Sequence, residues 1–508
     1  MSIAVVHSRA LAGVRSVAVA VEVHLTNGLP SFTIVGLPET AVKESKERVR
    51  SALVTSQFEF PARRITVNLA PADLPKEGGR FDLPIAIGIL AASGQIPVES
   101  STHHEFIGEL ALTGHLRPVR GLLPAALACK GAGRSLIIAA ENGAEVGLVK
   151  DLSAFGADHL LEITAHLSGA AALEPIEVCA VATGEAAPHP DLADVRGQHA
   201  AKRALVVAAA GAHSVLMVGP PGAGKTMLAS RLPGLLPELD DNEALTTGAV
   251  HSLADGGLEP SRWRQRPFRA PHHSASSVAL VGGGRQPRPG EVSLAHNGVL
   301  FMDELPEFDR RTLEQLREPL ETGAVHISRA AGRVEYPARF QLVAAMNPCP
   351  CGWLGDPGGR CTCTIEQVQR YRARVSGPLM DRIDIQILVP PVPRTVLQNP
   401  EPGDESSVLA RRRVVAARGR QIERSGVLNH RLNGRDLQHV CALDGPAQAL
   451  IDTAMDRFGL SARAYHRILR VARTVADLAG RDPVGLSEVA EAINYRILDR
   501  AEPRLSAR

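Results

Sequence analysis

The sequence lacks two features that would assign it at once to a specialised class. Its formal net charge is only +2 over 508 residues, so any nucleic-acid contact must come from local patches. One uncharged run, 204–224, approaches membrane-spanning length, but it contains Gly211, Pro220 and Pro221 and fits a helix, a strand and a turn better. The content of 44% hydrophobic and 22% charged residues is that of an ordinary globular protein.

Lysine is scarce in the sequence, and a secretion signal is missing. There are seven lysines, and the last is Lys225, so arginine supplies nearly all the positive charge. The N-terminus has no basic segment followed by an apolar block, which favours a cytoplasmic protein without a membrane anchor. Of the seven cysteines, four lie between 349 and 363. In a chain without an export signal, such a cluster indicates a metal site rather than disulfides.

The length suggests about three domains, because single hydrophobic cores stop growing at roughly 250–300 residues. Residues 1–171 combine strand and helix patterns and predict an α/β domain, and 172–193, with proline and glycine, predicts a linker. From 194 to 393 strands alternate with helices, as in a parallel sheet covered on both faces. Residues 394–508 predict a helical bundle. The predicted fold class is therefore α/β with a helical C-terminal part.

The most specific motif is GPPGAGKT at 219–226, between an apolar strand at 214–218 and a helix over 227–232. This is the phosphate-binding loop of P-loop NTPases in its required strand–loop–helix context. Its glycines let backbone N–H groups curl around a phosphate, Lys225 should reach the β- and γ-phosphates, and the Thr226 hydroxyl should bind Mg²⁺. The predicted nucleotide-binding residues are Gly219, Pro220, Pro221, Gly222, Ala223, Gly224, Lys225, Thr226 and Met227.

Two further strands end in polar residues. The strand GVLFM at 298–302 leads into Asp303 and Glu304, which predicts a Mg²⁺-holding acid followed by an acid that polarises the attacking water. The strand FQLVAAM at 340–346 ends at Asn347, whose amide can orient that water. The alternative for Asn347 is a simple strand-terminal turn, since Pro348 follows it.

These motifs, with DVRGQ (194–198), GEVSLAHNGVLFMDELPEF (290–308), LVAAMNPCPCG (342–352) and GPLMDRIDI (377–385), resemble the magnesium-chelatase-like AAA+ ATPases, and among them the ComM/YifB family. The resemblance covers nearly the whole chain. It implies an AAA+ core at 194–393, a lid of the magnesium-chelatase C-terminal type at 394–508, and ATP with Mg²⁺ as ligands.

The same resemblance implies roles for two arginines. Arg382, in DRID, looks like the arginine finger that completes a neighbour's site, and Arg463 looks like the second sensor arginine of the lid. Arg467, one helical turn later, is the alternative to Arg463. From the residues alone, either could instead be a surface arginine paired with an acid. A finger supplied in trans requires a homo-oligomer, and the resemblance implies a hexameric ring.

The stretch ITVNLAPADLPKEGGRFDLPI at 65–85 resembles the Lon-protease-like domain, here of the ChlI type. A serine–lysine peptidase needs a nucleophilic serine just after the glycine turn and a lysine base later. Gly78-Gly79 instead leads into Arg80, and the later turn at 119–124 offers no lysine at the expected place. We therefore expect no peptidase activity, and a role in ring assembly or substrate contact.

Two C-x-C pairs, Cys349 with Cys351 and Cys361 with Cys363, are separated by a loop rich in glycine and aspartate. Four thiolates brought together in this way suit a closed, structural Zn²⁺ site beside Asn347. The spacing departs from the usual C-x₂₋₄-C, and four reduced thiols without a metal are the alternative.

Alternation on both sides of Ala330-Ala331-Gly332 predicts a β-hairpin over 325–336, whose tip carries Arg329 and Arg333. These arginines suit the phosphates of DNA in a central channel. A second segment, 262–269, mixes arginines with aromatic residues as single-strand binders do. For both segments a solvated surface is the alternative.

Three functions compete at this point. The resemblance implies a DNA motor, a helicase or translocase that branch-migrates recombination intermediates in transformation or repair. A chelatase-type subunit that couples ATP hydrolysis to metal insertion is the second. A Lon-like unfoldase without peptidase activity is the third, and the missing serine and lysine weaken a protease.

Overall fold

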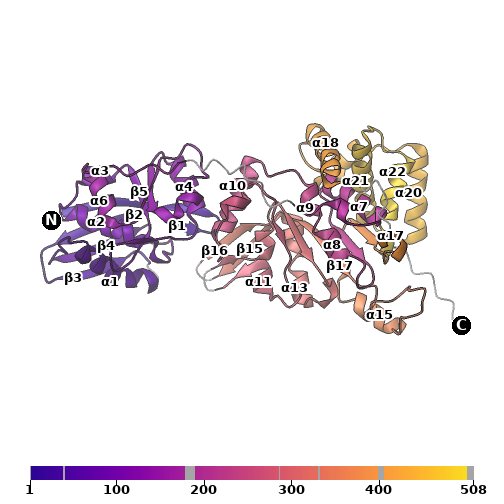
Figure 1. Cartoon of the computed structure of the whole chain (residues 1–508), viewed down its shortest axis with the longest axis horizontal. Coiled ribbons are helices and arrows are strands. Elements are labelled where there is room, and N and C mark those ends of the chain that lie inside the picture. Colours follow the sequence, from indigo (N-terminus) through magenta and orange to yellow (C-terminus); the bar gives the residue numbers. More distant parts are fainter. Residues whose placement is uncertain are drawn as a thin grey trace. The chain divides into compact units, whose positions relative to one another are not determined.

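The computed structural model describes residues 2–37, 40–177, 189–284, 287–329, 332–398 and 405–499. The chain forms two compact units. The first comprises Met1–Ala186, Asp241–Trp263 and His326–Tyr336, and the second comprises Ala187–Asp240, Arg264–Val325 and Pro337–Arg508. Figure 1 shows the chain coloured from the N-terminus to the C-terminus, with many of its helices and strands labelled.

The first unit contains a seven-stranded mixed sheet in the order β3-β4-β2-β1-β5-β8-β9. The β1–β2 hairpin and the β2–β4 pair are antiparallel, and the remaining neighbours are parallel. The strands of the unit are β1 Ser2–Ala12, β2 Arg15–Thr26, β3 Ser31–Val35, β4 Arg64–Ala70, β5 His104–Ile107, β6 Glu109–Leu110, β7 Leu116–Arg117, β8 Ser135–Ala139 and β9 Ala154–Ala157. Its helices are α1 Thr40–Thr55, α2 Asp82–Ala92, α3 Val98–Ser101, α4 Leu122–Gly131, α5 Gly143–Val146, α6 Leu160–Leu167 and α10 Asp241–Ser252.

Strand β2 shows why this sheet has a buried face. Every second residue from Val19 to Leu25 is buried, as the two-residue period of a strand requires. Helix α2 is buried along its whole length and packs on β1 and β2. At Gly88 a side chain would overlap Val23, with a Cβ only 2.5 Å from the valine methyl carbon, so the helix approaches the sheet closely there.

Two segments that follow the phosphate loop in sequence belong to the first unit. Helix α10 packs against α4, and the Gly121 N–H donates to the Ser252 carbonyl at 3.0 Å. Strands β15 (Ala324–Arg329) and β16 (Gly332–Pro337) form a two-stranded sheet, and Val334 lies against Gly13 in the β1–β2 turn. The predicted hairpin is therefore present, and its β16 strand packs on the N-terminal sheet.

The second unit is built on an entirely parallel sheet in the order β11-β14-β17-β10-β18. Its strands are β10 Val215–Val218, β11 Phe268–Arg269, β12 Gly282–Gly283, β13 Arg288–Pro289, β14 Val299–Met302, β17 Gln341–Met346 and β18 Ile385–Leu388. Its helices up to β18 are α7 His199–Gly211, α8 Lys225–Ala229, α9 Leu232–Leu235, α11 Ser277–Val281, α12 Glu291–Leu294, α13 Arg310–Glu314, α14 Arg317–Thr322, α15 Ile365–Arg372 and α16 Gly377–Met380. The three central strands are buried throughout, as expected for a parallel sheet.

The C-terminal part of the second unit is helical in its described residues, as predicted. The helices are α17 Arg394–Gln398, α18 Ser407–Ser425, α19 Gly434–Val440, α20 Gly445–Phe458, α21 Ala462–Ala479 and α22 Leu486–Asn494. A buried polar network ties them to the sheet. His213 lies between Asp384 and Thr474, with its Nδ1 3.3 Å from Asp384 Oδ2 and its Nε2 2.8 Å from Thr474 Oγ1.

The predicted strands at 214–218, 298–302 and 340–346 are confirmed within a few residues. No described helix combines the length and the apolar character needed to cross a membrane.

Candidate functional site

The phosphate loop connects the buried strand β10 to helix α8. A side chain at Gly219 would overlap the Val389 carbonyl, and Gly222 and Gly224 have positive φ values of 75° and 87°, which favour glycine. Pro221, Gly222, Thr226 and Met227 are exposed, so the outer side of the loop is open to a ligand. The eight-residue motif thus folds as a phosphate-binding loop must.

Lys225 lies inside the loop that precedes it. Its Nζ donates to the Gly219 carbonyl at 2.7 Å, to the Pro220 carbonyl at 3.0 Å and to Asn347 Oδ1 at 3.1 Å. Burial lowers the pKa of Lys225, and the carboxylates of Asp303 and Glu304 oppose that shift. The ammonium is thus held by neutral oxygens at the place where a nucleotide phosphate would offer negative ones.

The acidic pair follows β14 directly. Thr226 Oγ1 donates to Asp303 Oδ2 at 2.7 Å, so the predicted Mg²⁺ hydroxyl and carboxylate lie together. Hydroxyl and carboxylate oxygens are the hard ligands that Mg²⁺ prefers, and the pair fits that ion. Glu304 has a φ of 52°, rare for a residue with a side chain, and its N–H donates to Asp303 Oδ1 at 2.9 Å.

His273 is a neighbour of Glu304 that the sequence did not reveal. Its Nδ1 lies 3.2 Å from Glu304 Oε2, and both side chains are partly exposed. A contact between residues so far apart in the chain had no local signal, because it depends on the tertiary fold.

Asn347 follows β17, which lies between β14 and β10 in the sheet. The carboxyl ends of parallel neighbours meet at one edge, where open α/β sheets bind their ligands. Lys225, Asp303, Glu304 and Asn347 therefore gather from three adjacent strands. The bond from Lys225 places the Asn347 amide in the site rather than in an isolated turn.

Arg382 lies just after α16 and is tied to its own chain. Its guanidinium forms an ion pair with Glu321 and donates to the Pro378 carbonyl at 2.6 Å, and only 12% of its side chain is exposed. An arginine finger acts on a neighbouring subunit, so that role for Arg382 stays a proposal.

The two candidate sensor arginines have different surroundings. Arg463 is 72% exposed and lies 3.9 Å from Asp381. Arg467 is mostly buried and forms an ion pair with Asp384. Burial opposes ionisation of Asp384, but its hydrogen bond with His213 and the charge of Arg467 hold its pKa below the usual range. Arg467 therefore has a structural partner, and Arg463 is the one available to a ligand.

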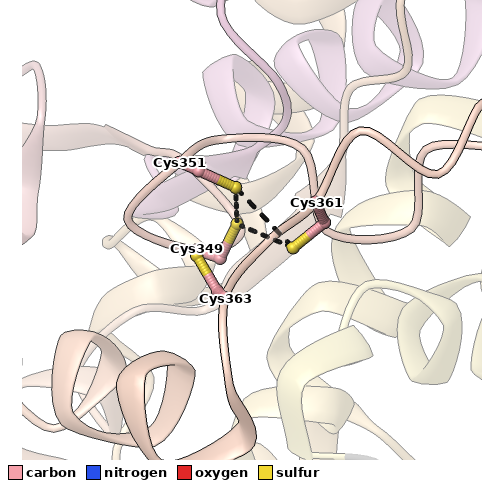
Figure 2. A group of neighbouring side chains, drawn as sticks. All are labelled: Cys349, Cys351, Cys361 and Cys363. Carbon is pink, nitrogen blue, oxygen red and sulfur yellow. Dashed lines mark hydrogen bonds between the residues drawn. The ribbon is translucent and has the colours of Figure 1, made fainter.

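The four clustered cysteines meet at one point, as Figure 2 shows. The Sγ atoms of Cys349 and Cys351 are 3.4 Å apart, those of Cys349 and Cys361 3.8 Å, and those of Cys351 and Cys361 3.6 Å. With Cys363 included, all four lie within 4.8 Å of one another. Zn–S bonds of about 2.3 Å in a tetrahedron place the sulfurs about 3.8 Å apart, so the cluster fits Zn²⁺.

Backbone donors also converge on these sulfurs. The N–H groups of Trp353 and Thr362 donate to Cys351 and, although burial opposes them, lower the pKa of its thiol to about 6. The backbone N–H of Cys363 lowers the pKa of Cys361 and that of Cys351 lowers the pKa of Cys363, but burial and the neighbouring thiols outweigh them, so both pKa values are raised, that of Cys363 to about 12. The backbone donors thus stabilise the thiolate of Cys351, the form that binds a metal.

In the first unit, the two segments that a serine–lysine peptidase would use are brought together. The guanidinium of Arg80 donates to the Arg120 carbonyl and, at 3.5 Å, to the Arg9 carbonyl. Burial lowers the pKa of Arg80 to about 10. Arg80 thus fills the position beyond the glycine turn where the peptidase mechanism needs a serine.

The predicted DNA contacts differ in what the structure describes. Arg333 in β16 is exposed, whereas the side chain of Arg329 lies outside the described residues. In the second basic segment, Arg269 forms a two-point ion pair with Glu291 at 2.6 and 2.7 Å, and Arg266 donates to the carbonyls of Pro237 and Asn297. Internal partners therefore occupy these two arginines of the segment 262–269.

The sheet, the phosphate loop and the acids at one sheet edge define a P-loop ATPase of the AAA+ class. Family profiles agree: "Magnesium chelatase, subunit ChlI" matches residues 191–397, "Subunit ChlI of Mg-chelatase" matches 21–142, and "Magnesium chelatase, subunit ChlI C-terminal" matches 404–496.

Full-length relatives narrow the class. The chain is 52% identical over 512 residues to "Competence protein ComM" of Haemophilus influenzae, covering 100% of both chains. It is 51% identical over 500 residues to "Uncharacterized protein YifB" of Salmonella typhimurium, covering 98% of each. A "Magnesium-chelatase 67 kDa subunit" of Heliobacterium mobile is 30% identical over 198 residues, covering 33% of this chain and 30% of that one. The chain belongs to the ComM/YifB family of magnesium-chelatase-like AAA+ ATPases, whose ligands are ATP and Mg²⁺.

Proposed function

We propose that this protein is a ring-forming ATPase that moves on DNA and branch-migrates recombination intermediates during DNA uptake or repair. The observation that carries the proposal is the meeting of Lys225, Thr226, Asp303, Glu304 and Asn347 at one sheet edge. The full-length match to a relative named a competence protein supports DNA as the substrate.

Each residue has one task in the hydrolysis that we propose. Lys225 exchanges its carbonyl partners for β- and γ-phosphate oxygens, and Thr226 and Asp303 hold Mg²⁺, which neutralises charge on the phosphates. Glu304 accepts a hydrogen bond from the attacking water and polarises it, while Asn347 orients it. His273, beside Glu304, is placed to hold that carboxylate in position.

A ring follows from the in-trans role of Arg382. We propose a homo-hexamer in which Arg382 leaves Glu321 and reaches the nucleotide of the adjacent subunit, while Arg463 contacts the nucleotide from the lid. Hydrolysis then requires two neighbouring subunits. We propose that the relative movement of these subunits moves the DNA, whose phosphates are bound by Arg329 and Arg333 of the hairpin.

Zn²⁺ is the ion that we propose for Cys349, Cys351, Cys361 and Cys363. A closed site with four protein ligands leaves no position for a substrate, so its role is structural. We propose a cytoplasmic location, where such thiols stay reduced.

A chelatase-type ATPase is the alternative from another class, and a Lon-like unfoldase would use the same ATP site. The chelatase relative matches only a third of this chain, which supports the shared motor more than a shared substrate.

The test is steady-state ATP hydrolysis with no DNA, single-stranded DNA and four-way-branched DNA. Glu304→Gln is the blank, because it removes the water-polarising carboxylate and keeps the shape. Glu307→Gln is the matched control, since Glu307 lies three residues on and pairs with Arg374 at 2.7 Å. We expect stimulation that is greatest with branched DNA, lost in Glu304→Gln and kept in Glu307→Gln. Hydrolysis that no DNA changes would overturn the DNA motor and leave the ATPase.

A further inference from the structure

The cysteine loop, defined here as residues 348–363, begins at the ATP site. Asn347, which precedes it, accepts a hydrogen bond from Lys225 at 3.1 Å. After Cys363, Thr364 starts helix α15 with a capping box shared with Gln367. Burial raises the pKa of Tyr371, near the end of that helix, to about 12, and the backbone N–H of Asn347 lies close enough to oppose this shift. The loop therefore leaves Asn347, and the helix that follows it returns to the neighbourhood of Asn347.

The loop also touches the phosphate loop itself. Gly352 has a φ of 84°, and a Cβ added there would lie 2.7 Å from Pro221 Cδ and 3.9 Å from Asn347 Cγ. The backbone at Gly352 is thus packed against the ring of Pro221 without room for a side chain. One residue of the cysteine loop supports two residues of the nucleotide site.

Little apart from the cysteines holds this loop. From Pro350 to Cys363, Gly352 is the one buried residue, so no apolar core anchors the segment. Asp356 and Arg360 form a two-point ion pair at 2.7 and 2.9 Å, and the guanidinium carbon of Arg360 lies 3.5 Å from the centre of the Trp353 ring. These contacts join residues within the loop, so they do not tie the loop to the rest of the domain. A segment without a core depends on a cross-link or a bound metal for a fixed shape.

We infer that metal binding by Cys349, Cys351, Cys361 and Cys363 positions the phosphate loop, so that occupancy of the cysteine site sets the affinity for nucleotide. This rests on the proposed Zn²⁺ site and on the ATP site, and does not depend on DNA as the substrate. The metal fixes the two ends of the loop to each other, which presses Gly352 against Pro221 and keeps Asn347 beside Lys225. Without metal, Pro221 and Asn347 lose that support.

The test compares metal content with nucleotide affinity in the full chain, without DNA. Zinc is measured by elemental analysis, and affinity by titration with a fluorescent ATP analogue in the presence of Mg²⁺. We expect one zinc per wild-type chain. The double variant Cys361→Ser/Cys363→Ser should lose the zinc and bind the nucleotide about tenfold or more weakly, because small displacements of binding groups carry large costs. Cys129→Ala, a buried cysteine outside the cluster, should retain both properties.

A second variant separates the metal from the contact and guards against a double variant that does not fold. Gly352→Ala keeps all four ligands but places a methyl group against Pro221. We expect it to retain zinc and still to bind the nucleotide several-fold more weakly. The change in the logarithm of the dissociation constant should be roughly half of that caused by metal loss. A wild-type chain without stoichiometric metal would overturn the metal site. Wild-type affinity in a folded, zinc-free double variant, or in Gly352→Ala, would overturn the link to the phosphate loop.

Discussion

Two glycine turns, one in each unit, are each followed by a helix and place a cation against backbone carbonyls. In the second unit, Lys225 rests on the carbonyls of Gly219 and Pro220. In the first unit, Arg80 follows Gly78-Gly79 and rests on the carbonyls of Arg9 and Arg120. The two turns differ in what surrounds the cation.

Around Lys225 the loop stays open. Thr226 is exposed, and the carboxylates of Asp303 and Glu304 lie at the same edge, so phosphate and Mg²⁺ have both room and partners. Around Arg80 the structure is closed. Arg80, Phe81 and Asp82 are all buried, and the first unit encloses the guanidinium with its own carbonyls. A cation becomes a ligand-binding group only where the fold leaves one side of it free for the ligand.

Replacing one buried lysine in each unit, Lys225 and Lys76, tests this contrast with the largest expected effect. Lys225→Ala should lower nucleotide affinity and hydrolysis by at least about a hundredfold, because the only cation inside the phosphate loop is lost. Lys76 is fully buried and donates to the Pro71 carbonyl in the first unit. Lys76→Ala should lower the melting temperature and leave nucleotide affinity unchanged. Titration with a fluorescent ATP analogue and a thermal melt of both variants distinguish the roles, and weakened nucleotide binding in Lys76→Ala would break the contrast.

A structural feature could be predicted from the sequence where its residues lie close together in the chain. GPPGAGKT and the strand ending in Asp303-Glu304 are continuous patterns with a required context, so the sequence named Lys225, Thr226, Asp303 and Asn347, whose side chains the structure brings together. The cysteine cluster was also predictable, because its four ligands lie within one short segment.

Features that depend on distant parts of the chain were not predictable. Strand β1 reads SIAVVHSRALA, and its charged Arg9 is stabilised by Glu105 through bonds of 2.5 and 2.8 Å, a partner that no local pattern reveals. The membership of 241–263 and 326–336 in the first unit depends on contacts with α4 and Gly13. His273 beside Glu304 and Gly352 against Pro221 have the same origin.

Arg80→Ala tests the closed turn and should have the next largest effect. It leaves the buried Arg9 carbonyl and the partly buried Arg120 carbonyl without their charged donor, at a cost of about 2–4 kcal/mol in the free energy of unfolding of the first unit. The melting temperature should fall by about 5–10 °C, with nucleotide affinity unchanged. Arg80→Lys is the matched control and should recover only part of the lost stability, because an ammonium cannot donate to both carbonyls as the planar guanidinium does. A melting temperature that does not change in Arg80→Ala would show that Arg80 is not a packing residue.

Substitutions in the hairpin β15–β16 test the proposed DNA contact and should have a smaller effect than those of Lys225 and Arg80. Arg329→Ala and Arg333→Ala should each weaken DNA binding uniformly across sequences and reduce the slope of log affinity against log salt by about 1, while basal hydrolysis is kept. Arg117→Ala is the matched control, because Arg117 is an exposed arginine outside both candidate DNA segments. Fluorescence anisotropy with labelled DNA at several salt concentrations measures both quantities. Hairpin variants with the wild-type slope would exclude the hairpin as the DNA contact.

Substitution of Glu145 should give the smallest change in stability, and the direction in which that change depends on pH can be measured. Its carboxylate accepts hydrogen bonds from Ser252 and, at 2.8 Å, from the Leu123 N–H, close to the enclosed Arg80. Burial raises the pKa of Glu145 above 4.5, although these bonds and the charge of Arg80 oppose the shift. The folded state therefore binds this proton more tightly than the unfolded chain, so the stability contribution is full below pH 4.5 and is lost as the pH rises through the folded pKa. Glu145→Gln keeps the acceptor for Leu123 and removes the titration. Relative to wild type, the variant should gain about 1–3 °C in melting temperature between pH 4 and pH 8. If the melting temperature of Glu145→Gln instead fell relative to wild type between pH 4 and pH 8, the ionised carboxylate would stabilise the first unit. The surroundings of Glu145 would then be more open to solvent than those of Arg80.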